Sequence, residues 1–102
     1  MTAPLALDEY QASASRTMNS ALSDEQRLLD AACGLAEEAG EVLAHVRKHV
    51  MQHRALDRER LTEELGDALW CLSIVARSLD IPLSAVADAN VAKLRRRYPD
   101  GF

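Results

Sequence analysis

Two short acidic motifs at the same helical phase are the residues whose types and spacing suggest chemistry in this chain. The first motif places Glu38 three residues before Glu41, and the second places Glu64 three residues before Asp67. Both motifs also share a Glu-Glu pair, a glycine and two leucines at equivalent positions. At 3.6 residues per turn, the two acids of each pair lie about 60° apart around a helix. Each motif therefore predicts two carboxylates on one helix face.

Four carboxylates brought together without cations would repel one another and destabilise the fold. A hard divalent cation removes this repulsion, and Mg²⁺ prefers oxygen ligands and commonly bridges carboxylates to substrate phosphates. A single Glu-x-x-Glu pair is usually only a solvated helix face. The duplication favours a metal site, but it does not separate a metal-dependent enzyme from a metal-sensing or purely structural bundle. Gly40 and Gly66, which each cost about 1 kcal/mol relative to alanine in a helix, are predicted to leave space beside the acids.

Composition favours one domain of packed helices over residues 1–102. The chain is 48% hydrophobic but only 4% aromatic, and its net charge of -4 argues against general binding to nucleic acid or to an anionic membrane. No apolar run approaches the roughly 20 residues of a membrane span, and the N-terminus has no basic region followed by an apolar stretch, so we expect no secretory signal. Cys33 and Cys71 are predicted to be small core residues in a reducing cytoplasm.

Four helices are predicted from apolar spacing and capping residues, over about residues 8–18, 23–50, 57–79 and 84–97. Ser23 and Gln26 form a capping box before the longest apolar pattern. Asp57 is predicted to cap the third helix and Ser84 the last one. Because short connections favour antiparallel neighbours, the second and third helices should direct both acidic pairs into one cleft. The expected fold is an all-α, four-helix bundle-like domain.

The third helix is apolar on two sides. Trp70 and Ile74 project from the side opposite its main apolar stripe, so we expect another subunit or the rest of the chain to cover them. With so short a chain, this predicts a homodimer or homotetramer. The main stripe consists of Leu61, Leu65, Ala68, Leu69, Leu72, Val75, Ala76 and Leu79.

Near the C-terminus, Asn90, Lys93 and Arg97 recur at i, i+3 and i+7, on one helical stripe. Lysine as a point charge and arginine as a fork would suit a triphosphate. Alternatively, the basic residues 93 and 95–97 only complement the negative end of the helix dipole. We assign Asn90, Lys93 and Arg97 to the ligand, and Arg95 and Arg96 to solvent.

A histidine ladder, His45, His49 and His53, invites a zinc interpretation because its members are four residues apart. No His-Glu-x-x-His context accompanies it. We therefore interpret the ladder as a surface feature, with His45 able to reach the acids beside Glu41.

The acidic motifs and their neighbours resemble the signature of the MazG-like nucleoside triphosphate pyrophosphohydrolases, members of the all-α NTP pyrophosphatase superfamily. The resemblance implies that Glu38, Glu41, Glu64 and Asp67 bind Mg²⁺, with Mn²⁺ as a substitute, and that Glu37 orients or deprotonates water. It also implies a nucleotide site that includes Asn90 and Lys93, and base contacts from Tyr10 and Gln11. The matching residues are 10–11, 34–41, 63–70, 90–94 and 97–102.

The activity implied by this resemblance is hydrolysis of a nucleoside or deoxynucleoside triphosphate to the monophosphate and pyrophosphate, as in house-cleaning of nucleotide pools. The alternative from another class is a non-catalytic nucleotide- or metal-binding bundle acting as a partner or regulatory subunit. A di-iron bundle needs Glu-x-x-His motifs, and none follows these acids. The sequence does not decide base preference, dimer against tetramer, or the role of Glu63.

Overall fold

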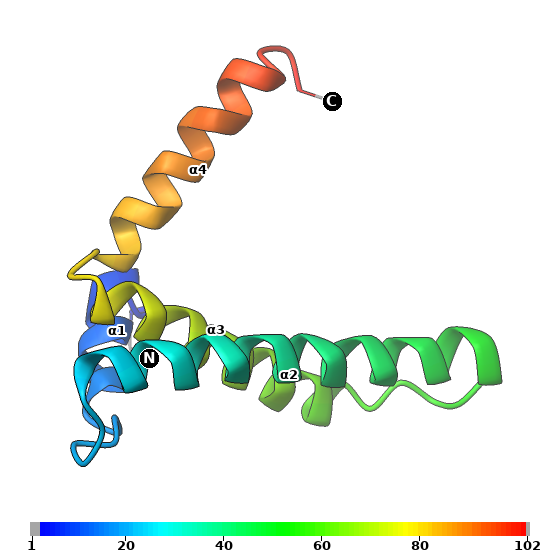
Figure 1. Cartoon of the computed structure of the whole chain (residues 1–102). Coiled ribbons are helices and arrows are strands. Elements are labelled where there is room, and N and C mark those ends of the chain that lie inside the picture. The colour runs from blue at the N-terminus through cyan, green and yellow to red at the C-terminus, as the bar shows by residue number, and fades with distance from the viewer. Residues whose placement is uncertain (1–2, 102) are drawn as a thin grey trace.

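The computed structural model describes residues 3–101 and confirms the all-α fold (Figure 1). No strand is formed within these residues. Phe102, the end of the last matching motif, lies outside them. The four helices are α1 (Leu7–Ser15), α2 (Asp24–Gln52), α3 (Arg58–Ser78) and α4 (Leu83–Arg97).

The long helices α2 and α3 lie side by side, and α3 runs back along α2 (Figure 1). The predicted capping box starts α2: the Ser23 hydroxyl accepts a hydrogen bond from the backbone N–H of Gln26, whose side chain accepts from the Ser23 N–H. His53 ends α2 in the left-handed conformation, with φ 54°. Asp57 then caps α3, as predicted, by accepting from the Arg60 N–H. These local signals set the antiparallel pairing of the two acidic helices.

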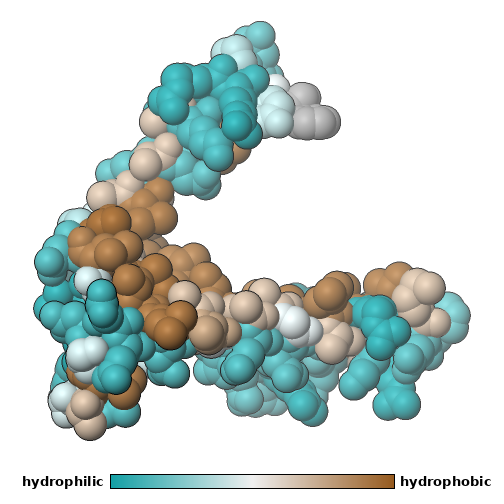
Figure 2. Space-filling view, in the orientation of Figure 1, coloured by the Kyte–Doolittle hydropathy of each residue, from teal (hydrophilic) through white to brown (hydrophobic). Residues whose placement is uncertain are grey.

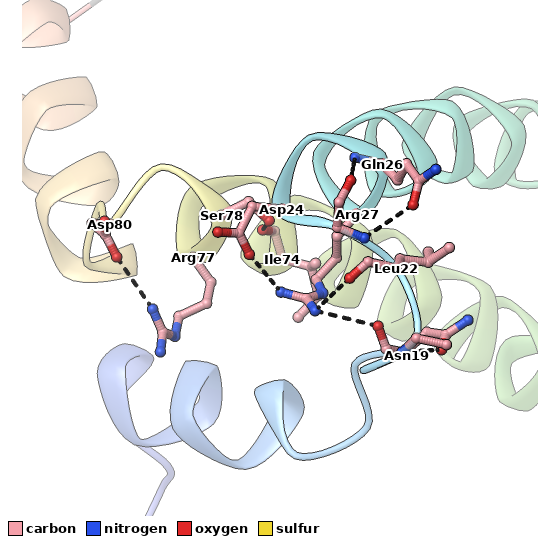
Figure 3. A network of polar contacts seen from close by, with 11 residues as sticks. Asn19, Leu22, Asp24, Gln26, Arg27, Ile74, Arg77, Ser78 and Asp80 are labelled. Atoms are coloured by element: carbon pink, nitrogen blue, oxygen red, sulfur yellow. Dashed lines mark hydrogen bonds and ion pairs between the residues drawn. The ribbon is translucent and has the colours of Figure 1, made fainter.

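The turn between α1 and α2 is held by one arginine (Figure 3). The Arg27 Nη2 atom donates to the carbonyl oxygens of Asn19 and Leu22, at 3.3 Å and 3.2 Å. Its Nη1 atom lies 3.2 Å from a carboxylate oxygen of Asp24. Helix α1 ends at Ser15, three residues earlier than predicted, and the backbone N–H groups of residues 16–18 donate to carbonyls three residues back, as in a turn.

Gln11 joins three parts of the fold. Its Nε2 atom donates to the carbonyl oxygens of Ser73 and Ile81, at 3.3 Å and 3.0 Å, and its Oε1 atom accepts from the Leu83 N–H at 3.0 Å. Because only 7% of Gln11 is exposed, these bonds form away from water and fix α1 against α3 and the start of α4. The small buried apolar core around this junction comprises Ala14, Ala31, Cys71, Ile74, Ala76 and Leu83. Cys33 is exposed, so its predicted core position is wrong.

Ser84 does not cap α4. The helix begins at Leu83, and Pro82 at its N-cap position offers no side-chain hydrogen bond. Asp8 of α1 replaces the missing cap: its carboxylate accepts from the Ser84 N–H at 2.8 Å and from the Ser84 hydroxyl at 2.7 Å. The start of α4 is therefore fixed by α1, although the two residues lie far apart in sequence.

Helix α4 leaves α3 at 100° and does not pack against α2 (Figure 1). The radius of gyration is 16.1 Å, whereas a compact chain of this length would have about 13 Å. One chain therefore forms an open angle rather than a closed bundle. Within the described residues, no single helix has the length and apolar character of a membrane span; the bent α3–α4 pair meets those criteria by length and composition only.

The structure buries the side of α3 that carries Trp70 and Ile74 and leaves much of its main apolar stripe exposed. Ile74 is only 1% exposed, and the Trp70 Nε1 atom donates to the Ala14 carbonyl at 3.2 Å and the Thr17 hydroxyl at 2.8 Å. Helix α1 thus covers this side, so that of the two expected alternatives the rest of the chain, and not another subunit, covers Trp70 and Ile74. Much of the main stripe is exposed instead, namely Leu65, Leu69, Leu72 and Leu79. Figure 2 shows apolar side chains gathered on the concave side, where α4 leaves the other helices.

Candidate functional site

Five acids from α2 and α3 form one electrostatic cluster, which consists of the four paired acids of the two motifs and Glu37. The pKa of Glu38 is raised from its ordinary value. Burial of the carboxylate is the largest cause, followed by repulsion from Asp67, Glu41, Glu37 and Glu64. Because charges on both helices act on Glu38, the antiparallel pair brings all five predicted acids together. We call these five residues the acidic cluster.

Glu64 connects the acidic cluster with neighbouring basic side chains. Its Oε1 atom lies 3.5 Å from Arg60 Nε, and its Oε2 atom lies 3.6 Å from His45 Nδ1. Only 12% of the Glu64 side chain and 13% of the His45 side chain are exposed, so the predicted surface position of His45 is wrong. The buried Glu64 Oε2 atom has no hydrogen-bond partner. Since buried polar atoms are normally satisfied, this oxygen is available to a ligand.

Asp67 lies towards α1. The pKa of Tyr10 is raised, first by burial, then by the negative charge of Asp67 and, at a pH high enough to ionise its thiol, by that of Cys71. The pKa of the Cys71 thiol is also raised, first by burial and then by acids that include Glu38 and Asp67. Both groups therefore keep their protons at neutral pH. Tyr10 places a neutral hydroxyl at the α1 end of the acidic cluster.

The acidic cluster fits a hard divalent cation by its chemistry. Its donors are carboxylate oxygens, which Mg²⁺ and Mn²⁺ prefer, and one of them is the unsatisfied oxygen of Glu64. No three histidine, cysteine, aspartate or glutamate side chains in the described part of the chain are already arranged to hold an ion, so the carboxylates would have to turn towards it. A Cβ atom at Gly40 or Gly66 would meet nothing within 4 Å, as expected if these positions leave space.

A cavity of about 200 Å³ adjoins the acidic cluster. It lies between the C-terminal half of α2, the α2–α3 connection and the first turns of α3, and we call it the α2–α3 cavity. Sequence reasoning missed it, although Lys48 follows His45 by one turn and Arg60 precedes Glu64 by one turn, both signals of a shared face. Its lining residues are Glu41, Ala44, His45, Lys48, His49, Arg54, Ala55, Asp57, Arg60 and Glu64.

Four other predicted substrate contacts are not brought to the acidic cluster within this chain. Asn90, Lys93 and Arg97 are exposed on α4, which leads away from α2 and α3 (Figure 1). The amide of Gln11 is occupied by three backbone groups. Base contact by Gln11 and phosphate contact by the α4 stripe therefore stay predictions, and in this chain Gln11 joins helices.

Comparison with known proteins agrees with the all-α fold. The MazG nucleotide pyrophosphohydrolase domain matches residues 26–102. The chain therefore belongs to the MazG family, which confirms the resemblance seen in its motifs.

The chain is similar to the Gene 37 protein of Mycobacterium phage L5, with 36% identity over 72 residues. The match covers 67% of this chain and 63% of that relative, so the chain spans less than two thirds of the relative's length. No solved structure matches the chain.

Proposed function

We propose that the protein is a Mg²⁺-dependent nucleoside triphosphate pyrophosphohydrolase that releases a nucleoside monophosphate and pyrophosphate. The observation that carries this proposal is the acidic cluster, in which burial and then repulsion from the other four acids raise the pKa of Glu38. Such repulsion is relieved when a cation and its phosphate ligand enter between the helices. Membership of the MazG family supports a nucleotide as substrate and pyrophosphohydrolysis as the reaction.

Glu38, Glu41, Glu64 and Asp67 would hold the cation, because they supply carboxylate oxygens from both helices. A bound divalent cation would neutralise phosphate charge and lower the pKa of a coordinated water. Glu37 neighbours this set, and we assign it the task of orienting the attacking water and accepting its proton.

The proposed reaction is a single displacement at the α-phosphorus. The water oxygen forms a bond to that phosphorus, and the bond to the oxygen bridging the α- and β-phosphates breaks. That bridging oxygen leaves with pyrophosphate. The carboxylates position the substrate, since correct alignment of the reacting atoms supplies much of the rate acceleration in such reactions.

A panel of ribo- and deoxyribonucleoside triphosphates, incubated with the purified protein and Mg²⁺, tests this reaction. Separation of the products should show monophosphate and pyrophosphate in equal amounts, and Mn²⁺ should replace Mg²⁺. Orthophosphate together with a nucleoside diphosphate would reject the reaction. The same panel identifies the preferred base and sugar.

We further propose that a second copy of the chain covers the exposed apolar stripe. The surface area is 7970 Å², whereas a folded monomer of 11.2 kDa has about 5,700 Å². The excess of roughly 2,300 Å² is comparable with what one subunit buries in an obligate homodimer. Formation of a homodimer or homotetramer would bury this apolar stripe. Asn90, Lys93 and Arg97 would reach an acidic cluster only across such an interface.

A non-catalytic nucleotide- or metal-binding subunit is the second candidate. It is favoured by the finding that no three acidic or histidine side chains in residues 3–101 are already arranged as metal ligands. Thermal stabilisation by Mg²⁺ and a triphosphate without turnover would support this candidate, because a ligand that binds only the folded state raises its stability.

A further inference from the structure

We propose that α4 is an assembly arm, whose apolar side packs on the α2–α3 pair of a second copy of the chain. We further propose that Asp8 and Gln11 of α1 hold this arm in the direction that the contact needs. The arrangement rests on the proposed oligomer and adds to it the segment that each copy contributes. Its tests measure assembly, so they are independent of whether the protein hydrolyses a nucleotide.

Helix α4 is almost uncovered in its own chain. Only Leu83, its first residue, is buried, and within residues 3–101 the helix contacts α1 and α3 but not α2. The rest of the arm projects from the corner where α1 and α3 lie (Figure 1). Isolated helices of up to about 15 residues are marginal in water, and most helices in proteins are stabilised by packing of an apolar side. The arm therefore needs a contact that its own chain does not supply.

The apolar residues of α4 have the spacing of a helix–helix contact. Ala87, Val91 and Leu94 recur at intervals of four and three residues, which gives the narrow stripe that a paired helix buries. Val91 is 44% exposed and Leu94 is 45% exposed. The first three leucines of the exposed α3 stripe have the same two intervals. Figure 2 shows apolar side chains continuing from this region onto the start of α4 on the concave side.

Charge favours the α2–α3 pair of another copy as the surface that the arm meets. After Asp88, all charged residues of α4 are basic, whereas α2 and α3 together carry more acids than basic residues. Two arms would repel each other, but an arm and an acidic helix pair attract. The exposed area in excess of a compact monomer, roughly 2,300 Å², is enough for a mutual contact of this kind. The basic residues of α4 are Lys93, Arg95, Arg96 and Arg97.

Contacts from α1 fix the direction of the arm at its first turn, and we call them the α1 latch. The Asp8 carboxylate accepts from the N–H and the hydroxyl of Ser84. The buried Gln11 amide accepts from the Leu83 N–H and donates to the Ile81 carbonyl. Because the first N–H groups of a helix have no partner within it, a swing of the arm would leave these groups unpaired. An arm held in one direction also loses less conformational freedom on association.

Two double variants of the full-length protein test the arm. Val91→Glu with Leu94→Glu places two charges on its apolar stripe. Ala89→Glu with Ala92→Glu adds the same charge at exposed residues on another side of the helix, and is the matched control. Sedimentation equilibrium measures the mass of each variant, and circular dichroism reports whether the helices are formed.

We expect the Val91/Leu94 variant to be a monomer at concentrations where the wild type and the Ala89/Ala92 variant are assembled, because burying unpaired charge is costly. An assembled Val91/Leu94 variant would overturn the arm, while the α3 stripe could still be an interface. Equal dissociation of both variants would overturn the apolar contact. A monomeric wild type would overturn the arm and the proposed oligomer together.

A double-mutant cycle on assembly tests the α1 latch. Asp8→Ala removes the acceptor at Ser84, and Glu9→Ala, an exposed acid in the same turn of α1, is the control. The dissociation constant of the assembly is measured for each, for Leu94→Ala, and for Asp8→Ala combined with Leu94→Ala.

We expect Asp8→Ala to raise this dissociation constant at least about fivefold, as for loss of a helix cap, and Glu9→Ala to change it less than about twofold. The effect of Asp8→Ala should be smaller in the Leu94→Ala chain, because both residues act on one contact. Additive effects of Asp8→Ala and Leu94→Ala, or an unchanged dissociation constant in Asp8→Ala, would overturn the latch.

Discussion

His45 of α2 and Glu64 of α3 face each other across the helix pair, with Nδ1 3.6 Å from Oε2 and both side chains nearly enclosed. Both residues line the α2–α3 cavity, and Glu64 also belongs to the acidic cluster. The acids and the cations therefore form one continuous polar surface along the helix pair.

Replacing Glu64 or Asp67 by alanine should abolish Mg²⁺-dependent turnover while the helices stay formed. Each change removes one proposed ligand, and we expect kcat to fall by at least about 100-fold, beyond the usual cost of losing a supporting contact around a metal. Glu59→Ala, an exposed acid in the first turn of α3, is the matched control. Steady-state kinetics and circular dichroism provide the readouts. Substantial activity in the Glu64 or Asp67 variant would contradict the assignment.

Gly34 and Gly66 should respond differently to alanine. A Cβ atom at Gly34 would lie 2.8 Å from Cys71 Sγ, whereas a Cβ atom at Gly66 would meet nothing within 4 Å. Gly34→Ala should lower the free energy of unfolding by about 1–3 kcal/mol through overpacking. Gly66→Ala should raise it by roughly 0.5–1 kcal/mol through helix propensity.

Urea denaturation measures both glycine changes. Adding Cys71→Ala to Gly34→Ala tests the cause, because removal of the sulfur should recover part of the lost stability. If Gly34→Ala is as stable as the wild type, the close approach of α2 and α3 at this point is not real.

The Asp8 contact to α4 should make stability depend on pH in a defined direction. The pKa of Asp8 is lowered, first by the Ser84 hydroxyl and then by the Ser84 N–H. A lowered folded-state pKa contributes stability above the unfolded-state value, about 3.8, and this contribution is lost as pH falls through the folded-state pKa. The stability advantage of the wild type over Asp8→Asn should therefore be constant near neutral pH and shrink below about pH 4.

Urea unfolding from about pH 3 to pH 7 measures the Asp8 effect, with Asp88→Asn on α4 as control. Hydrogen exchange in the first turn of α4 should also speed up in Asp8→Asn, because the Ser84 N–H loses a charged acceptor. If the stability difference between the wild type and Asp8→Asn does not change with pH, the charge of the Asp8 carboxylate does not contribute to stability.

The wild type should form an assembly larger than one 11.2 kDa chain. Leu65→Glu combined with Leu69→Glu places charge on the exposed stripe and should shift the mass towards the monomer, because burying unpaired charge in an interface is costly. Thr62→Glu, exposed on the same helix, should leave the mass unchanged. Light scattering measures the mass of each variant in solution. A monomeric wild type would contradict the proposal that a second copy of the chain covers the stripe.

Features set by neighbouring residues could be predicted from the sequence, and features set by distant contacts could not. Ser23 and Asp57 cap their helices through side-chain bonds only three residues long, so the antiparallel acidic pair followed from local pattern. The periodicity of α3 revealed two apolar sides, but it could not show that α1 covers Trp70. That choice depends on a hydrogen bond to Ala14, 56 residues away.

The direction of α4 was beyond reach for the same reason. It depends on Asp8 and Gln11, which bind the start of α4 from more than 70 residues earlier in the chain. The shape of the α2–α3 cavity depends on the left-handed conformation of His53. Such a conformation is usually signalled by a glycine, and the sequence has a histidine there. Sequence therefore located the acids, while the tertiary structure located the cations beside them.

Hydrolysis in ¹⁸O-labelled water tests the central claim most directly. The protein is incubated with Mg²⁺ and its preferred triphosphate, and mass spectrometry locates the label in the separated products. Attack at the α-phosphorus puts one ¹⁸O atom into the nucleoside monophosphate and none into pyrophosphate. Label in pyrophosphate, or in orthophosphate beside a nucleoside diphosphate, would contradict the account.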